Sequence, residues 1–234
     1  MEKKQTKINF DMKISSFYSS SNFFLNSLFD LYGSDKGTNN MTLAKPYVWN
    51  SHTYGDYYSR LFDHCVENIS NVFECGLGTN DTNIPSNMGK HGKPGASLRA
   101  WRDYFPKANI YGGDIDKNIL FEEERIKTFY VDQMKRETIK NLWDQINIDN
   151  FDLIIEDGLH TFEAAINFFE MSIDRLSDNG IYIIEDVQTS EFSDFAKYFE
   201  LKKIYTVNFI ILQNTKMQKT NSNLIEIRKI NKKN

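Results

Sequence analysis

Residues 71–78 have the sequence NVFECGLG, in which a short apolar run ends in an acid and two glycines. Such a run is typical of a buried strand, and the glycines let the backbone turn and approach a ligand closely. Apolar residues then recur at helical spacing across residues 96–105. Residues 71–105 are therefore predicted to form one strand, loop and helix unit.

The alternation of strand and helix continues along the chain and predicts a parallel sheet covered by helices. Residues 204–212 and 223–229 follow one another without a helix between them, so we expect these two strands to pair antiparallel. The predicted class is α/β, a Rossmann-like doubly wound sheet that is mostly parallel with an antiparallel C-terminal strand. The other predicted strands are 109–114, 127–132, 151–156 and 180–185, and the other predicted helices are 136–146, 161–176 and 192–199.

The first 70 residues have a different pattern, in which helical candidates at 14–31 and 54–66 flank a stretch rich in Gly, Asn and Thr. We predict an N-terminal helical cap or lid, residues 1–70, over the carboxyl edge of the sheet. A ligand-binding domain, residues 71–234, follows it, and both parts are expected to form one compact unit.

The composition limits the class of protein. The chain has 234 residues, 40% of them hydrophobic and 26% charged, which is typical of a globular domain. No apolar run approaches the ~20 residues that cross a bilayer, and residues 1–13 lack the apolar centre of a signal peptide. We therefore predict a cytoplasmic protein without a transmembrane segment. The net charge is −4, and residues 216–234, with six Lys or Arg against one Glu, contribute +5, so the rest of the chain carries −9. This acidic body argues against nucleic acid as a partner.

Acidic side chains end several predicted strands, at the edge where open α/β sheets bind ligands. A dinucleotide site would need a third glycine where this chain has Asp81. Asp114 is placed to accept hydrogen bonds from ribose hydroxyls, and Asp132 with Gln133 to meet an adenine amino group. These residues suit a nucleoside without a pyrophosphate, although turn-capping acids would give the same pattern.

Two acidic pairs end the next two strands, Glu156 with Asp157 and Glu185 with Asp186. Carboxylates gathered at one edge repel one another unless solvent separates them or a cation such as Mg²⁺ bridges them. His160 follows closely and has a near-neutral reference pKa, so it could take a proton from an acceptor hydroxyl or amine. A structural loop histidine is the alternative.

The predicted cap also carries charged residues. Residues 32–38 (YGSDKGT) place an acid and a base between glycines, which is typical of a mobile loop over a ligand or of a plain surface turn. Lys36, His52 and Lys90 or Lys93 are candidates for holding an anionic acceptor, such as a nucleotide-linked sugar or a phosphate-derived group.

Four motifs together resemble class I S-adenosylmethionine-dependent methyltransferases: ECGLG (74–78), PGASLRAWRDYFP (94–106), YGGDID (111–116) and EDGLH (156–160). The chain is most similar to the branch that methylates sugar hydroxyls on macrolides and surface glycans. The resemblance covers about residues 30–215, and the combination is more specific than any single motif.

The resemblance implies S-adenosylmethionine as the cofactor, bound by the domain that begins at residue 71. The implied cofactor-binding residues are Glu74, Gly76 and Gly78 on the methionine and ribose side, Ser97 in the following helix, Asp114 on the ribose, and Asp132 with Gln133 at the adenine.

In metal-dependent sugar members of this family, an Asp and a His three residues later serve as metal ligand and general base. The resemblance implies these roles for Asp157 and His160, with Asp186 completing a Mg²⁺ site. The chain departs from the common pattern at Glu156 and Leu159, where many relatives carry Asp and Ser.

The predicted function is methyl transfer to an oxygen of a sugar or sugar-linked acceptor, including phosphate-derived acceptors, with His160 as the general base. The acceptor would be a small molecule or glycan in surface polysaccharide or natural-product biosynthesis. The alternatives are a non-catalytic nucleoside-binding relative and a nicotinamide-dependent oxidoreductase, which the missing third glycine disfavours. The apolar run 209–212 is a candidate surface for a homo-oligomer.

Overall fold

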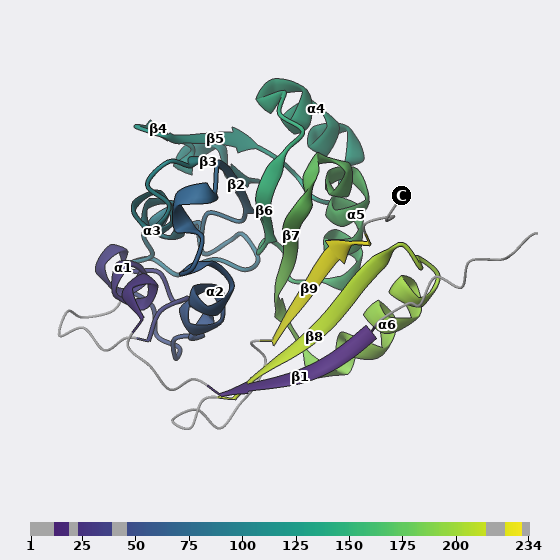
Figure 1. The fold of residues 1–234 in the computed structure, drawn as a ribbon. Helices are drawn as coiled ribbons and strands as arrows, with labels where there is room; N and C mark the ends of the chain where they lie inside the picture. Colours follow the sequence, from purple (N-terminus) through teal and green to yellow (C-terminus); the bar gives the residue numbers. More distant parts are fainter. Residues whose placement is uncertain (1–11, 19–22, 39–45, 214–222, 231–234) are drawn as a thin grey trace, which may run out of the picture.

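The computed structural model describes residues 12–18, 23–38, 46–213 and 223–230, which form one nine-stranded sheet with helices on both faces (Figure 1). The strands are β1 (Met12–Tyr18), β2 (Asn71–Cys75), β3 (Asn109–Asp114), β4 (Glu122–Glu123), β5 (Ile126–Tyr130), β6 (Phe151–Glu156), β7 (Leu176–Val187), β8 (Tyr205–Gln213) and β9 (Asn223–Lys229). The α-helices are α1 (Phe24–Tyr32), α2 (Tyr54–Phe62), α3 (Ala96–Tyr104), α4 (Arg136–Ile146), α5 (Phe162–Ser172) and α6 (Phe192–Glu200).

The strand order across the sheet is β1-β8-β9-β7-β6-β2-β3-β5-β4. Strand β2 pairs in parallel with β3 and β6, and the parallel pairing continues to β5 on one side and β7 on the other. Strand β9 pairs antiparallel with both β7 and β8. The predicted fold class, including the antiparallel C-terminal pair, is confirmed.

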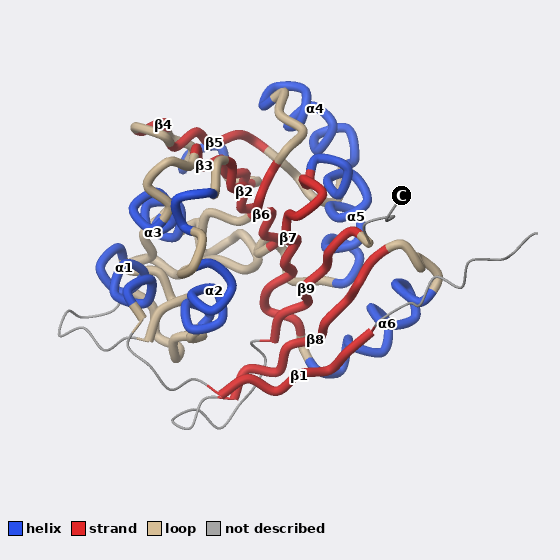
Figure 2. Tube along the Cα trace, viewed as in Figure 1, coloured by secondary structure: helices blue, strands red, loops and turns tan. Residues whose placement is uncertain are grey.

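Apolar side chains form one packed layer on each face of the sheet. Trp101 of α3 belongs to the first layer, together with residues of α1 and α2. Trp143 of α4 belongs to the second layer, together with residues of α5 and α6. Figure 2 shows the same division, with α1 to α3 on one side of the strands and α4 to α6 on the other. The carboxyl edge of the parallel strands is thereby left open to a ligand.

The N-terminal part differs from the predicted helix over residues 14–31. Residues 12–18 form strand β1, which pairs in parallel with β8, and α1 begins only at Phe24. Ile14 on this edge strand is 70% exposed, so backbone pairing rather than burial of an apolar face explains the element. The division of the chain at residue 70 stays a prediction, but β1 belongs to the sheet rather than to a cap.

The apolar run at residues 209–212 does not form a free surface. Phe209, Ile210 and Leu212 are buried within the fold, because β8 lies between β1 and β9 with an apolar layer on each face. The expectation of a dimer surface at this run is therefore wrong. Among the residues that the structure describes, no helix is both long and apolar enough to cross a membrane.

Candidate active site

A cavity of about 500 Å³ lies at the carboxyl edge of the sheet. That volume is within the range that encloses a drug-sized ligand, roughly 300–1,000 Å³. Most of the residues predicted for the site line this one space: Lys36, His52, Gly76, Gly78, Asp114, Asp132, Gln133, Asp157, His160 and Asp186. The structure thus brings the residues predicted to bind a nucleoside into the same cavity as the acids and the histidine that follow β6 and end β7.

The glycines after β2 are required by close packing. Gly76 has φ +96°, and a Cβ atom added there would lie 1.9 Å from the Asp157 carbonyl oxygen. Gly78 has φ +76°, and its Cβ atom would lie 2.7 Å from a side-chain carbon of Met88. Because L side chains rarely adopt this backbone conformation, glycine serves both the turn and the approach of β2 to the β6 loop.

Main-chain donors hold the acids that follow β3 and β5. Asp114 accepts a hydrogen bond from the Leu77 N–H (2.7 Å) and another from the Asp116 N–H (2.8 Å). Burial raises the pKa of Asp114. The Asp132 carboxylate accepts a hydrogen bond from the Met134 N–H (3.0 Å). Both carboxylates line the cavity in fixed positions, as a ribose and adenine site would need.

Gln133, which follows β5, contacts the end of β6 and the loop after it. Its Nε2 atom donates to Glu156 at 2.5 Å, and its Oε1 atom accepts from the Leu159 N–H at 2.9 Å. A Cβ atom at Gly158 would lie 1.9 Å from the same Oε1 atom. Glu156 is buried, and this burial raises its pKa. The Gln133 amide therefore fixes the loop that carries His160, and its contact with adenine stays a prediction.

Glu74 and Ser97 lie behind the cavity wall rather than in it. The Glu74 carboxylate is fully buried, and it accepts hydrogen bonds from the Ser97 hydroxyl (2.6 Å) and the Trp101 Nε1–H (2.5 Å). Burial raises the pKa of Glu74, against the opposing charge of Lys36. The two residues brace the strand that ends in the glycine turn, and direct contact with a cofactor stays a prediction.

His160 stands between two carboxylates. Its Nε2 atom lies 3.1 Å from Asp157 Oδ1, and its Nδ1 atom lies 3.5 Å from Asp186 Oδ2. Burial alone would lower the pKa of His160, but the charges of Asp186 and Asp157 outweigh it and raise the pKa to about 10. The next residue, Thr161, caps α5 by accepting a hydrogen bond from the Ala164 N–H (3.3 Å), which fixes where the loop ends.

Backbone strain is concentrated around the cavity. His160, Asp186, Ser86 and Thr53 all have φ between +54° and +61°, a region that non-glycine residues rarely adopt. Three of them line the cavity, and Thr53 lies between the lining residues His52 and Tyr54. Strained residues of this kind persist where the surrounding structure holds them, and they are enriched at functional sites.

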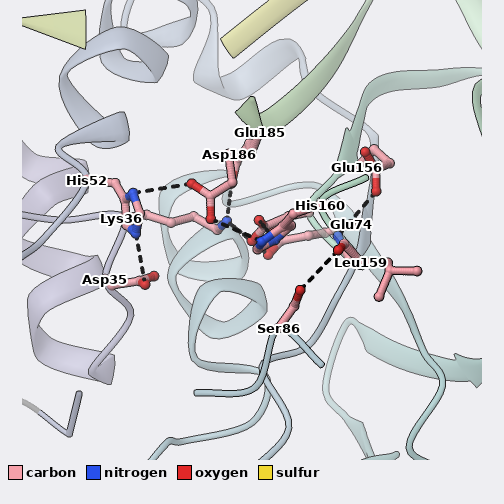
Figure 3. Close-up of polar contacts among 12 residues, drawn as sticks. Asp35, Lys36, His52, Glu74, Ser86, Glu156, Leu159, His160, Glu185 and Asp186 are labelled. Atoms are coloured by element: carbon pink, nitrogen blue, oxygen red, sulfur yellow. Dashed lines mark hydrogen bonds and ion pairs between the residues drawn. The ribbon is translucent and has the colours of Figure 1, made fainter. Parts of the chain in front are cut away.

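His52 approaches the acids from the N-terminal part. Its Nε2 atom lies 3.2 Å from Asp35 and its Nδ1 atom 3.3 Å from Asp186 (Figure 3). Burial would lower the pKa of His52, but the carboxylates of Asp186 and Asp35 raise it to about 9. The Trp49 Nε1–H also donates to Asp35 (2.6 Å), so this acid orients both rings.

Lys36 lies deeper, among three carboxylates. Its ammonium is 2.5 Å from Asp157 Oδ2 and 3.6 Å from Glu74, and it also pairs with Glu185. Burial lowers the pKa of Lys36, but the charges of Asp157 and Glu185 prevail and hold it well above its ordinary value. The surroundings carry more acids than cations, so the structure does not support the expectation that Lys36 holds an anionic acceptor.

Two tyrosines of α2 reach the same group, and neither was assigned a role at the site from the sequence. The Tyr54 hydroxyl donates to Asp186, and the Tyr58 hydroxyl donates to Glu185 at 2.5 Å. The signal was available, because residues 54 and 58 are four apart in a predicted helix and so share one face. What the sequence could not tell is that this face meets the end of β7.

The donor atoms of Asp157, His160 and Asp186 lie within 4.8 Å of one another. Two carboxylates at this spacing are a donor set that a hard cation such as Mg²⁺ prefers. Asp157 Oδ2 and Glu185 already contact Lys36, so the oxygens left for a metal are on the His160 side. The residues present fit a divalent cation.

Part of this chain is similar in sequence to curated proteins. It is 30% identical over 162 residues to 8-demethyl-8-α-L-rhamnosyl tetracenomycin-C 2'-O-methyltransferase of Streptomyces olivaceus, which is 69% of this chain and 40% of that protein. It is also 30% identical to mycinamicin VI 2''-O-methyltransferase of Micromonospora griseorubida, over 62% of this chain and 34% of that protein. The chain thus spans between about a third and two fifths of the length of these relatives. No family model matches it.

Solved structures of methyltransferases are also similar to this chain. The MycE methyltransferase of the mycinamycin pathway, solved with Mg, S-adenosylhomocysteine and mycinamycin VI, is 26% identical with a TM-score of 0.55, covering 75% of this chain and 40% of that one. A putative caffeoyl-CoA O-methyltransferase from Staphylococcus aureus has a TM-score of 0.51 at 12% identity, covering 88% and 93%, and shares the fold. The resemblance to class I methyltransferases of the macrolide sugar branch is confirmed.

Proposed function

We propose that this chain is an S-adenosylmethionine-dependent O-methyltransferase whose acceptor is a hydroxyl of a sugar-linked small molecule. One observation carries the proposal: a single cavity joins the glycine turn and Asp114 to the group around His160. Donor and acceptor held in one enclosed space react as neighbours, and such positioning supplies much of an enzyme's rate. The sugar O-methyltransferase names of the relatives support the same activity.

The β2, β3 and β5 side would bind the cofactor. The turn at Gly76 and Gly78 would pass the methionine part, Asp114 would accept hydrogen bonds from the ribose hydroxyls, and Asp132 would border the adenine. S-adenosylmethionine supplies a methyl group already activated on a sulfonium, so the protein's work is to position the acceptor and remove its proton.

The β6 and β7 side would hold the acceptor. Asp157 and Asp186 would bind Mg²⁺, and the bound ion would orient the acceptor hydroxyl and lower its pKa. Beside Asp186 and Asp157, His160 has a pKa of about 10 and is protonated at neutral pH. Cancelling part of that negative charge would lower the pKa, because the attraction of the two carboxylates raises it. Its neutral imidazole would then be the group that accepts the hydroxyl proton as the methyl group is transferred.

The charge balance favours a neutral acceptor. Asp35, Asp157 and Asp186 face the cavity, and cations among the lining residues already pair with them. An added phosphate would meet this negative field, so we place a sugar hydroxyl ahead of a phosphate-derived acceptor. Trp49 and Asn50 also line the cavity and offer an apolar ring with nearby hydrogen-bonding groups, which suits a sugar.

The test is methyl transfer from S-adenosylmethionine carrying a trideuterated methyl group. The acceptor panel combines glycosylated aglycones, nucleotide-linked sugars and surface-type oligosaccharides, and mass spectrometry detects the added group and its position. We expect label on a sugar oxygen, with glycosides ahead of phosphate-bearing sugars. Tight binding of S-adenosylhomocysteine without label on any acceptor, in the presence of Mg²⁺, would favour the non-catalytic alternative.

A further inference from the structure

Backbone hydrogen bonds hold Lys36 in place. The Lys36 carbonyl accepts a hydrogen bond from the Gly55 N–H (3.0 Å), and the neighbouring Asp35 carbonyl accepts from the His52 N–H (2.7 Å). A third bond, from the Thr53 N–H to the Gly37 carbonyl (3.0 Å), fixes the other side. The segment after α1 is thereby pinned to the residues before α2, so Lys36 enters the site from a fixed point.

Its side chain then reaches the ends of three strands (Figure 3). The ammonium contacts Glu74 of β2, Asp157 directly after β6, and Glu185 of β7, and the Lys36 residue is only 2% exposed. Three carboxyl groups gathered at a largely buried point would be unfavourable without a cation. A lysine ammonium is a compact point charge, so it can serve several oxygens at once.

The geometry divides the acid group into an inner and an outer side. On the inner side, Lys36 contacts Asp157 Oδ2 and Glu185. On the outer side, Asp157 Oδ1 and Asp186 face His160 and the cavity. Asp157 belongs to both sides, because each of its oxygens meets a different cation.

We propose that Lys36 is a built-in cation of this site, which takes the inner position between Asp157 and Glu185 and so confines a divalent cation to the outer side. It is a positioning residue: it fixes Asp157 so that Oδ1 stays directed at His160. The inference rests on the proposed function only for what the bound cation does at the site. The competition between Lys36 and a metal can be measured without methyl donor or acceptor.

The test compares Mn²⁺ binding to the wild-type chain and to Lys36→Met, which keeps the length of the side chain and removes its charge. We expect the variant to bind Mn²⁺ about tenfold more tightly or better, because the inner oxygens lose their competing charge. Electron paramagnetic resonance of free Mn²⁺ gives the affinity, and thermal unfolding should show a larger stabilisation by Mn²⁺ in the variant than in the wild type.

Lys90→Met is the matched control. Lys90 is exposed on the loop beside the cavity, so this variant has the same loss of charge without touching the acid group. We expect it to bind Mn²⁺ as the wild type does. A folded Lys36→Met variant with wild-type Mn²⁺ affinity would overturn the proposal, and so would an equal gain in both variants.

A second pair of variants keeps the proposal testable if Lys36→Met does not fold. Lys36→Met combined with Glu185→Gln removes the ammonium together with one of its carboxyl partners and is compared with Glu185→Gln alone. We expect tighter Mn²⁺ binding in the double variant, because Asp157 Oδ2 is then free; equal affinities would contradict the proposal. The Mn²⁺ titrations contain no methyl donor, so their result does not depend on methyl transfer. Absence of methyl transfer to the acceptor panel would overturn the proposed function and leave the Mn²⁺ result standing.

Discussion

The two halves of the cavity hold their carboxylates by different means. On the β3 and β5 side, Asp114 and Asp132 accept hydrogen bonds from main-chain N–H groups, and the exposed Lys135 ammonium also lies 2.9 Å from Asp132. On the β6 and β7 side, Asp157 and Asp186 meet charged or polar side chains, several of them from the N-terminal part, among them the buried Lys36.

The difference concerns charge. Main-chain donors are neutral and fixed by turn geometry, so the first half depends less on a balance of charges. The second half depends on a balance of opposite charges, which a metal or a substitution alters. We therefore expect substitutions on the first side to change cofactor affinity, and substitutions on the second side to change turnover and cation binding.

The largest expected effect is that of His160→Ala, which tests whether the two halves act separately. Turnover should fall by roughly 10²–10⁴, the usual contribution of a general base. The affinity for S-adenosylhomocysteine, measured by calorimetry, should stay nearly unchanged, because His160 lies on the β6 side. A large loss of cofactor affinity in this variant would show that the halves are not separate.

Gly76→Ala tests the contact between the turn after β2 and the loop after β6, where the two halves of the cavity meet. A methyl group there would lie 1.9 Å from the Asp157 carbonyl oxygen, in a backbone conformation with φ +96°. We expect a loss of about 3 kcal/mol or more in the free energy of unfolding, from steric overlap together with backbone strain.

Gly89→Ala is the control for backbone strain alone, since Gly89 has φ +73° and nothing within 4 Å of an added Cβ atom. It should cost about 1–2 kcal/mol. Urea unfolding measures both variants, and equal losses would mean that contact with the Asp157 carbonyl does not constrain residue 76.

Asp114→Asn has a smaller expected effect than Gly76→Ala and sharpens the comparison from the other side. The amide oxygen still accepts from the Leu77 N–H, but the amide NH₂ replaces the oxygen that accepts from the Asp116 N–H, and the charge that would bind the ribose is lost. S-adenosylhomocysteine should bind roughly ten- to a hundredfold more weakly, as expected for a charged hydrogen bond of ~1.5–3 kcal/mol. Mn²⁺ affinity should not change. A change confined to Mn²⁺ affinity would reverse the roles assigned to the two halves.

The same contrast explains how much the sequence could predict. The strands around β2 and the acids that end them were predicted because short apolar runs are local signals, and parallel strands end at a common edge. Strand β1 was missed because it depends on pairing with β8, nearly two hundred residues away. Lys36 was identified as a candidate but assigned to an anionic acceptor, since its pattern resembles a surface turn and its buried partners lie on three distant strands.

The most direct test of the account is calorimetric titration of the protein with S-adenosylhomocysteine and, separately, with NADH, each with Mg²⁺ and with EDTA. We predict micromolar binding of S-adenosylhomocysteine in both conditions, because the main-chain-held half of the cavity needs no metal, and no binding of NADH. Binding of NADH alone, or of neither ligand, would contradict the assignment of a methyl-donor pocket to the glycine turn and Asp114.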